Sequence, residues 1–138
     1  MRRRLWGLGI AVVAMGLGWG MKGSVAQAGT DGEAARPEFY TAKVRPIFQS
    51  NCFRCHAGMN RRGGLSMSTR KGMMKGGKDG MVVVAGDPGR SLLVQGIRHE
   101  GRAKPMPEKD SKLSDADIAT VERWIRAGAA MPVDPSVQ

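Results

Sequence analysis

The sequence predicts a small, mostly α-helical domain, and three observations support this fold class. Apolar residues recur with roughly helical spacing in residues 37–51 and again in residues 114–128. The glycine-rich stretch between them contains one short β-prone run, residues 81–85. Only 5% of the 138 residues are aromatic, so little apolar surface is available for burial. Small chains of this kind commonly depend on a metal, a covalent link or a cofactor for stability.

The first 28 residues predict a secretory signal peptide. Residues 2–4 are arginines, residues 5–21 are apolar, and Ala26-Gln27-Ala28 provides a small-x-small cleavage site. The alternative is an uncleaved anchor in the inner membrane. The apolar stretch of 17 residues is short for a spanning helix and is diluted by glycines. We therefore expect an exported, periplasmic protein.

The exported chain is predicted to contain one domain. Residues 29–36 are small, polar and charged and predict a flexible leader, residues 37–131 form the domain, and residues 132–138 form a C-terminal tail. The net charge of the whole chain is +10. Four positive charges and no acidic residue precede position 29, so the exported part carries +6.

A basic surface of this kind would steer the protein towards acidic redox partners or towards an anionic membrane face. Export and the lack of interleaved aromatic residues argue against a nucleic-acid-binding module. The sequence does not indicate an oligomeric state.

Cys52, Cys55 and His56 form a Cys-x-x-Cys-His motif, which is the attachment signature of a c-type haem. Positions i and i+3 share one face of a helical turn, so both sulfurs can bond the same porphyrin. His56 follows directly and can bind the iron as its proximal ligand. We therefore expect one covalently attached haem c.

Three other uses of these residues are possible. A thioredoxin-like redox pair would lie in a βαβ unit, of which there is no sign. A zinc site needs four ligands, and His99 is the only further histidine, with a spacing unlike that of a zinc finger. A plain disulfide between Cys52 and Cys55 would leave His56 unexplained. We favour the haem.

The expected second axial ligand is Met106, and His99 is the alternative. Met106 lies between Pro105 and Pro107, which restrict the backbone and bar a helix, so its thioether can be held towards an iron. Imidazole also binds haem iron, and His99 lies seven residues earlier. We expect most of the remaining methionines of the exported chain to fill the core: Met59, Met67, Met73, Met74, Met81 and Met131.

The first half of the domain predicts one interrupted helix and irregular chain. Residues 37–51 form a helix that Pro46 bends or divides in two and that ends near Asn51. A weak signal for a short helical turn lies within residues 65–74. A turn at residues 86–89 follows the β-prone run.

Two further helices are predicted. Ser91 can cap a short helix that ends at Ile97. Ser114 and Asp117 form a variant of the capping box at the start of the last helix, and Gly128 is placed to end it. The apolar stripe of this helix should pack on Phe39, Val44 or Phe48 of the first helix, with Trp124 as a core residue. The stripe consists of Ile118, Val121, Trp124 and Ile125.

With these residues identified, the chain resembles the planctomycete-type cytochrome c domain over residues 44–129. The resemblance implies a helical cytochrome c-like domain wrapped around one haem, with His56 as proximal ligand and Met106 as distal ligand. One difference is Glu108, because the family often has a second proline after Met-Pro. The matching stretches are residues 44–48, 51–56, 63–65, 85–88, 91–93, 106–107 and 113–129.

The expected function is one-electron transfer outside the cytoplasm, not catalysis. If both axial positions of the iron are filled, other small molecules cannot bind without displacing a ligand. The sequence shows no constellation of acid, base and nucleophile. The alternative is a haem enzyme or gas sensor with an open sixth position, which requires both Met106 and His99 to be off the iron.

Overall fold

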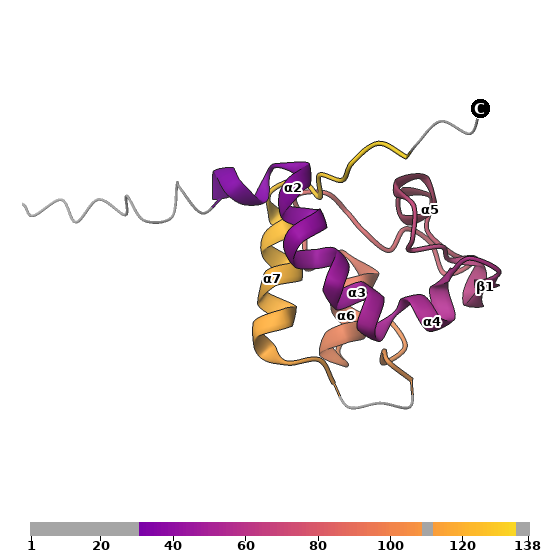
Figure 1. Ribbon diagram of the computed structural model, residues 1–138. Helices are drawn as coiled ribbons and strands as arrows, with labels where there is room; N and C mark the ends of the chain where they lie inside the picture. The colour runs from indigo at the N-terminus through magenta and orange to yellow at the C-terminus, as the bar shows by residue number, and fades with distance from the viewer. Residues whose placement is uncertain (1–30, 109–111, 135–138) are drawn as a thin grey trace, which may run out of the picture.

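The computed structural model describes residues 31–108 and 112–134 (Figure 1). In these residues the chain is mostly helical, as predicted, and no helix among them is long and apolar enough to cross a membrane. The predicted signal peptide lies outside the described residues. Residues 31–34 of the predicted leader form a helical turn in which Ala34 is buried, so this part packs on the domain.

The predicted first helix is one helical stretch with a wide turn inside it. It consists of α2 (Pro37–Phe39), the π-helical turn η1 (Tyr40–Val44) and α3 (Arg45–Asn51). The Arg45 N–H donates to the carbonyl of Tyr40, five residues earlier. The wide turn lies directly before Pro46, whose ring would crowd the carbonyl four residues earlier in a regular α-helix. The predicted interruption and the predicted end at Asn51 are both confirmed.

The last helix, α7 (Asp115–Arg126), begins with the predicted capping box. Ser114 Oγ accepts a hydrogen bond from the Asp117 N–H (3.1 Å) and donates one to the Asp117 carboxylate (2.8 Å). Gly128 follows the helix with a φ of 107°, and its N–H donates to the carbonyl of Ile125. The predicted start and end of this helix are therefore confirmed.

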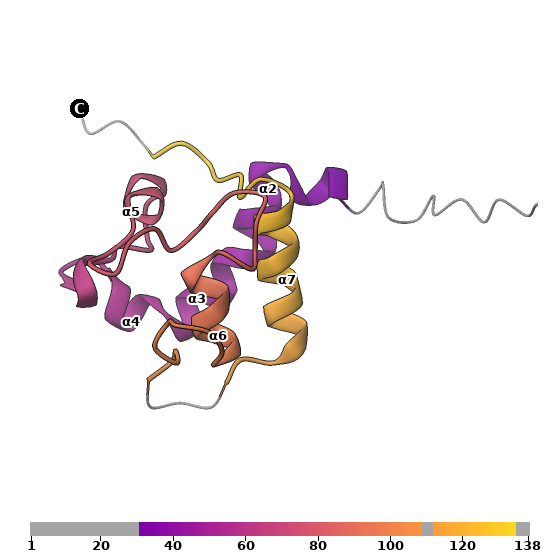
Figure 2. The same ribbon diagram turned by 180° about the vertical axis from the view of Figure 1, so that it is seen from behind.

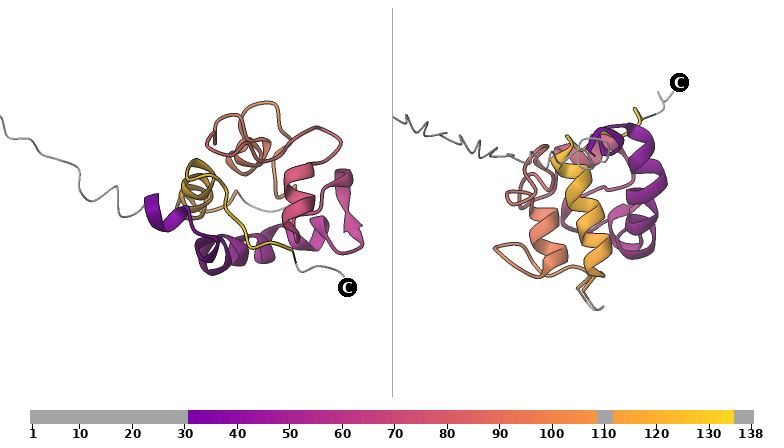
Figure 3. Two further views of the ribbon diagram at one scale, coloured as in Figure 1. Left: turned by 90° about the horizontal axis from the view of Figure 1, so that it is seen from above. Right: turned by 90° about the vertical axis from the view of Figure 1, so that its left-hand side faces the viewer.

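Trp124 of α7 joins the first and last helices, as expected. It is fully buried, and its ring centroid lies 5.4 Å from that of Tyr40 and 6.0 Å from that of Phe48. Its indole Nε1–H donates to the carbonyl of Ala130 (2.8 Å). Figure 3 shows α7 between the helical stretch 37–51 on one side and α6 (Leu92–Arg98) on the other. All four residues of the predicted apolar stripe are buried.

The β-prone run at residues 81–85 does not form a strand. Its backbone groups bond to the start of α6 instead of a neighbouring strand: the Val84 N–H donates to Ser91 Oγ (2.9 Å), and the Leu93 N–H donates to the Val82 carbonyl (2.9 Å). The predicted capping role of Ser91 is also wrong. Ser91 occupies the N-cap position, but its fully buried hydroxyl donates to the Asp87 carbonyl (2.8 Å) and makes no bond to α6.

The glycine-rich middle of the chain folds into short elements at one end of the molecule. These are α4 (Phe53–His56), β1 (Asn60–Arg61), the 3₁₀ turn η2 (Arg62–Gly64) and α5 (Arg70–Lys75). The views in Figures 1 and 2 both place α4, β1 and α5 at the end away from α7. The weak helical signal in residues 65–74 corresponds to α5, which occupies the second half of that range and extends one residue beyond it.

Asp134, in the predicted C-terminal tail, binds the start of α5. Its carboxylate accepts hydrogen bonds from the backbone N–H groups of Arg70 (2.7 Å) and Lys71 (2.8 Å). The bonds from Lys71 and Arg70 hold the pKa of this carboxyl below its usual range, because they stabilise the charged form. The chain after α7 therefore fastens the glycine-rich end to the rest of the domain.

Replacing Asp134 with Asn should loosen α5. Amide exchange at Arg70 and Lys71 should become roughly tenfold faster, because each N–H loses a charged acceptor. The pKa of Asp134 is lowered in the folded state, so its contribution to stability is present above the usual Asp pKa of about 3.9. That contribution disappears as the pH falls through the lowered pKa.

The control for this experiment is Asp79→Asn, which removes the same charge from an exposed residue two positions after Gly77. Denaturant unfolding at neutral and strongly acid pH provides the comparison. Equal stability of the two variants at neutral pH would contradict the role of Asp134.

Candidate haem-attachment site

The two cysteines and His56 lie on one short turn after the first helical stretch. At Cys52 the backbone leaves the regular helix (φ −121°, ψ −38°), and α4 begins at the next residue. The N–H groups of Cys55 and His56 both donate to the Cys52 carbonyl (3.1 and 3.0 Å). The three side chains are partly buried, and the two thiols are not joined by a disulfide. This turn brings together the three residues that the motif predicts.

The His56 ring is held by a backbone carbonyl. Its Nδ1 lies 3.1 Å from the carbonyl oxygen of Arg62, and because a carbonyl only accepts, Nδ1 carries the hydrogen. Burial lowers the pKa of His56, which favours the neutral ring. In a neutral ring protonated at Nδ1, Nε2 has a lone pair. Among the described residues, none forms a hydrogen bond with Nε2.

The Arg62 carbonyl reaches His56 because the chain reverses direction directly after the motif. Antiparallel bridges pair His56 with Arg61 and Ala57 with Asn60. The Asn60 side-chain amide donates to the Arg54 carbonyl (3.1 Å) and ties the reversal to α4. This partner could not be predicted from the sequence, since a backbone carbonyl six residues away leaves no trace in residue type.

The environment of Cys52 keeps its thiol protonated. Burial raises the pKa of Cys52 to about 12, and the neighbouring Cys55 thiol adds to the effect. Cys52 also packs against the hydrophobic core, at the end of the helical stretch that carries Phe48. Its sulfur therefore lies where the apolar interior meets the attachment turn.

Met106 lies against the end of α6. Its N–H donates to the Gly96 carbonyl (3.0 Å), and its carbonyl oxygen lies 3.2 Å from His99 Nε2. The side chain is partly buried. The peptide bond from Met106 to Pro107 is cis.

The attachment turn and the Met106 loop are neighbours. Arg62, whose carbonyl binds His56, forms an ion pair with Glu108, two residues after Met106 (3.9 Å). The Glu108 carboxylate also acts on the pKa of His56, which it raises against the stronger effect of burial. Glu108 pairs with Lys104 on its own loop as well (3.8 Å). Glu108 thus links the two loops.

The structure separates the other methionines into two groups. Three are buried in the core, as expected: Met67, Met73 and Met131. Met74 is partly buried and packs on that core. Met59 and Met81 are exposed, so the expectation that most of these methionines fill the core is confirmed with these two as exceptions. Met59 lies at the tip of the chain reversal after His56, where the tight turn points its side chain into solvent.

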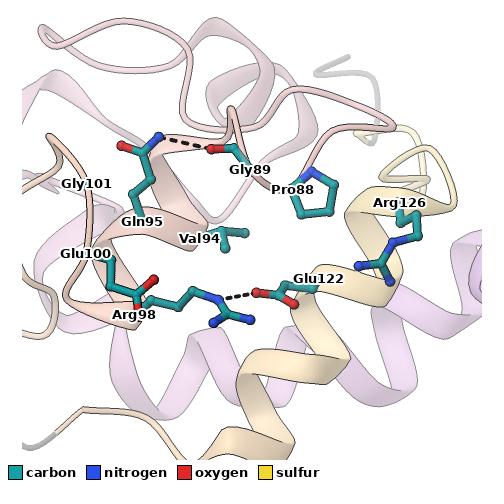
Figure 4. Close-up of a pocket in the computed structure, with 9 residues that line it drawn as sticks. All are labelled: Pro88, Gly89, Val94, Gln95, Arg98, Glu100, Gly101, Glu122 and Arg126. Atoms are coloured by element: carbon teal, nitrogen blue, oxygen red, sulfur yellow. Dashed lines mark hydrogen bonds and ion pairs between the residues drawn. The ribbon is translucent and has the colours of Figure 1, made fainter.

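Two cavities lie outside this cluster. One, of about 480 Å³, lies between α6, α7 and the turn at residues 86–89, where Arg98 and Glu122 form an ion pair across it (Figure 4). The other, of about 280 Å³, is bordered by Arg61, Lys71 and Lys75. None of the predicted haem residues lines either one.

The donor atoms of the site fit a covalent haem better than a bare metal ion. Within residues 31–108 and 112–134, no group of three or more His, Cys, Asp or Glu side chains could hold a metal ion. The zinc site considered above is therefore not assembled in this region. Two unpaired thiols on one turn, followed by an imidazole with an available Nε2, are the groups that haem attachment requires.

Comparison with known families agrees with this chemistry. Residues 52–110 match the family model described as Planctomycete cytochrome C, a stretch that begins at Cys52 and includes His99 and Met106. The resemblance drawn from the sequence is thereby confirmed, over a shorter range than residues 44–129. Similarity to this family indicates a haem-binding electron carrier. No curated protein and no solved structure matches the chain significantly.

Proposed function

We propose that this protein is an exported, mono-haem c-type cytochrome that carries single electrons, with His56 and Met106 as axial ligands of the iron. The main support is the hydrogen bond from His56 Nδ1 to the Arg62 carbonyl. A histidine held in this way presents Nε2 in a fixed direction and in the state that binds a metal. Such an outer partner is typical of histidines that ligate metals.

Each residue of the site has a distinct task in this proposal. Cys52 and Cys55 hold the haem through thioether bonds, and His56 binds its iron from the attachment side. The carbonyl of Arg62 orients the His56 ring and increases its basicity. Bound haem supplies an iron that exchanges one electron between the ferrous and ferric states. Cys52 packs against the hydrophobic core, so its thioether would lie at the edge of the apolar interior.

One ring nitrogen of His99 is already engaged by the backbone of Met106. A carbonyl oxygen only accepts, so His99 Nε2 carries a hydrogen in this bond, and only Nδ1 of the ring keeps a lone pair. The Met106 thioether makes no competing bond among the described residues. Filling of the sixth position by Met106 would favour electron transfer over the alternative of an open-site enzyme or gas sensor.

The proposal is tested first by the covalent link. The secreted protein should carry the mass of one haem and should begin after Ala28. The double variant Cys52→Ala, Cys55→Ala should be colourless or should lose its colour in denaturant, whereas a variant of the exposed Met59 to Ala should keep the haem. A wild-type protein without added mass, with free or mutually bonded thiols, would refute the assignment.

Replacing Met106 with Ala tests the distal ligand. The variant should keep the covalent haem but lose the weak absorption band of a thioether–ferric iron bond at the red edge of the spectrum. Its ferrous form should bind carbon monoxide readily, because the sixth position is open. Met81→Ala, which changes an exposed methionine outside the site, is the control. If the wild type already binds carbon monoxide and lacks the band, the open-site alternative is favoured.

The proposed partner is a redox protein with an acidic docking surface. We define the basic segment as residues 52–78, which contains seven Lys and Arg residues and no Asp or Glu. The other residues from position 29 onwards contain eleven basic and twelve acidic residues. The whole positive excess of the exported chain therefore lies in the segment that carries the cysteines. All seven basic side chains are exposed.

The arrangement places positive charge around the site where electrons would enter or leave. The basic segment contains α4, β1 and α5, which gather at one end of the molecule (Figure 2). A local patch of one sign attracts a partner of the opposite sign and orients it during the encounter. An anionic membrane surface would be attracted by the same patch.

Reversing charge within the basic segment should slow reaction with an anionic redox partner. Oxidation of the ferrous protein by hexacyanoferrate(III) at low salt should become about fivefold slower or more in Lys71→Glu, Lys75→Glu. The control Arg36→Glu, Lys43→Glu changes the net charge equally at exposed sites elsewhere. The difference should vanish at high salt, because exposed charges are screened. Equal slowing in both variants would show that only net charge matters.

A further inference from the structure

The last turn of α6 binds both backbone groups of Met106. The Gly96 carbonyl accepts from the Met106 N–H (3.0 Å), and His99 Nε2–H donates to the Met106 carbonyl (3.2 Å). These two bonds fix the peptide units on both sides of the Met106 Cα atom. The direction in which the Met106 side chain leaves the backbone is consequently set by α6 and not by its own loop alone.

The Met106 side chain also lies directly on the surface of α6. A methyl group placed on Gly96 would lie 3.2 Å from the Lys104 carbonyl oxygen and 3.8 Å from both Cβ and Cγ of Met106. Gly96 is buried in a helix, where glycine is otherwise unfavourable. The absence of a side chain at this position permits the loop to approach the helix so closely.

His99 occupies an unusual backbone position for a residue with a large side chain. It ends α6 in the left-handed conformation (φ 60°, ψ 39°), where glycine or asparagine is the usual choice. Glycine would end the helix with less strain, so the backbone alone does not call for histidine. What histidine adds at this position is the Nε2–H that reaches the Met106 carbonyl.

We propose that His99 is a positioning residue that holds Met106 in place as distal ligand by donating from Nε2 to the Met106 carbonyl. This inference rests on the proposed His56 and Met106 ligation. His99 does not touch the iron in this arrangement. It lowers the cost of ordering the Met106 loop, so that the thioether competes better with other ligands.

The consequence is measurable as competition for the sixth position. Without the His99 bond, the Met106 loop would leave the iron more readily, and an added ligand would bind more tightly. The loss of one neutral hydrogen bond corresponds to about a three- to tenfold change in such an equilibrium.

The decisive comparison is between His99→Gly and His99→Gln. Glycine keeps the left-handed backbone conformation and removes the donor. Glutamine keeps an N–H donor on a side chain of similar reach but has the same backbone strain as histidine. The ferric protein is titrated with imidazole, the thioether band is recorded, and amide exchange is measured at Met106.

We expect His99→Gly to bind imidazole about three- to tenfold more tightly than wild type, with faster amide exchange at Met106. His99→Gln should restore much of the wild-type behaviour. If His99 served only to end the helix, His99→Gly would bind imidazole no more tightly than wild type and would show no faster amide exchange at Met106. In that case His99→Gln would have nothing to restore, and the proposal would be overturned.

Failure of the underlying ligand assignment would look different. If Met106 is not the distal ligand, the wild-type protein lacks the thioether band, and Met106→Ala leaves its spectrum unchanged. If His99 is itself the ligand, the wild-type protein lacks the thioether band, and His99→Gly loses low-spin ligation. A wild type with the band, together with an unaltered His99→Gly variant, would overturn the positioning role alone.

Discussion

The packing of Trp124 against Tyr40 and Phe48 is the contact on which the rest of the fold depends. These three rings join the last helix to the first helical stretch, and all three are almost fully buried. Phe48 lies one helical turn before Cys52, whose N–H donates to the Phe48 carbonyl. The aromatic cluster therefore fixes the end of α3, from which the attachment turn emerges. The chain has few aromatic residues, and these three pack together next to the attachment turn.

Regular, local patterns could be predicted from the sequence. The helix α7 carries a capping box, an apolar stripe and a C-terminal glycine, and each of these signals depends on residues within one or two turns. The first helical stretch likewise shows its proline and its apolar spacing. The attachment turn was predictable because its three residues are consecutive or nearly so and because few other uses explain all of them.

Contacts that depend on distant residues or on the backbone could not be predicted. Ser91 has the right type for a helix cap, but burial against the 82–87 loop engages its hydroxyl elsewhere. The run at residues 81–85 has strand-like composition, but no strand in the described part of the chain lies beside it, and its backbone bonds to the start of α6. The bond of Asp134 to α5 spans more than sixty residues. Local composition contains no information about such partners.

The same distinction applies to the candidate ligands. The sequence offers an imidazole at position 99 and a thioether at position 106 as rivals, because residue type alone describes what each could bind. In the folded chain they are partners: the ring nitrogen of one is occupied by the carbonyl of the other. Because Nε2 of His99 donates to the Met106 backbone, that nitrogen cannot itself bind iron, whereas the Met106 side chain takes no part in the bond. The hydrogen bond thus fixes the Met106 loop to the end of α6, and in the proposed ligation this contact would let the helix position the distal ligand.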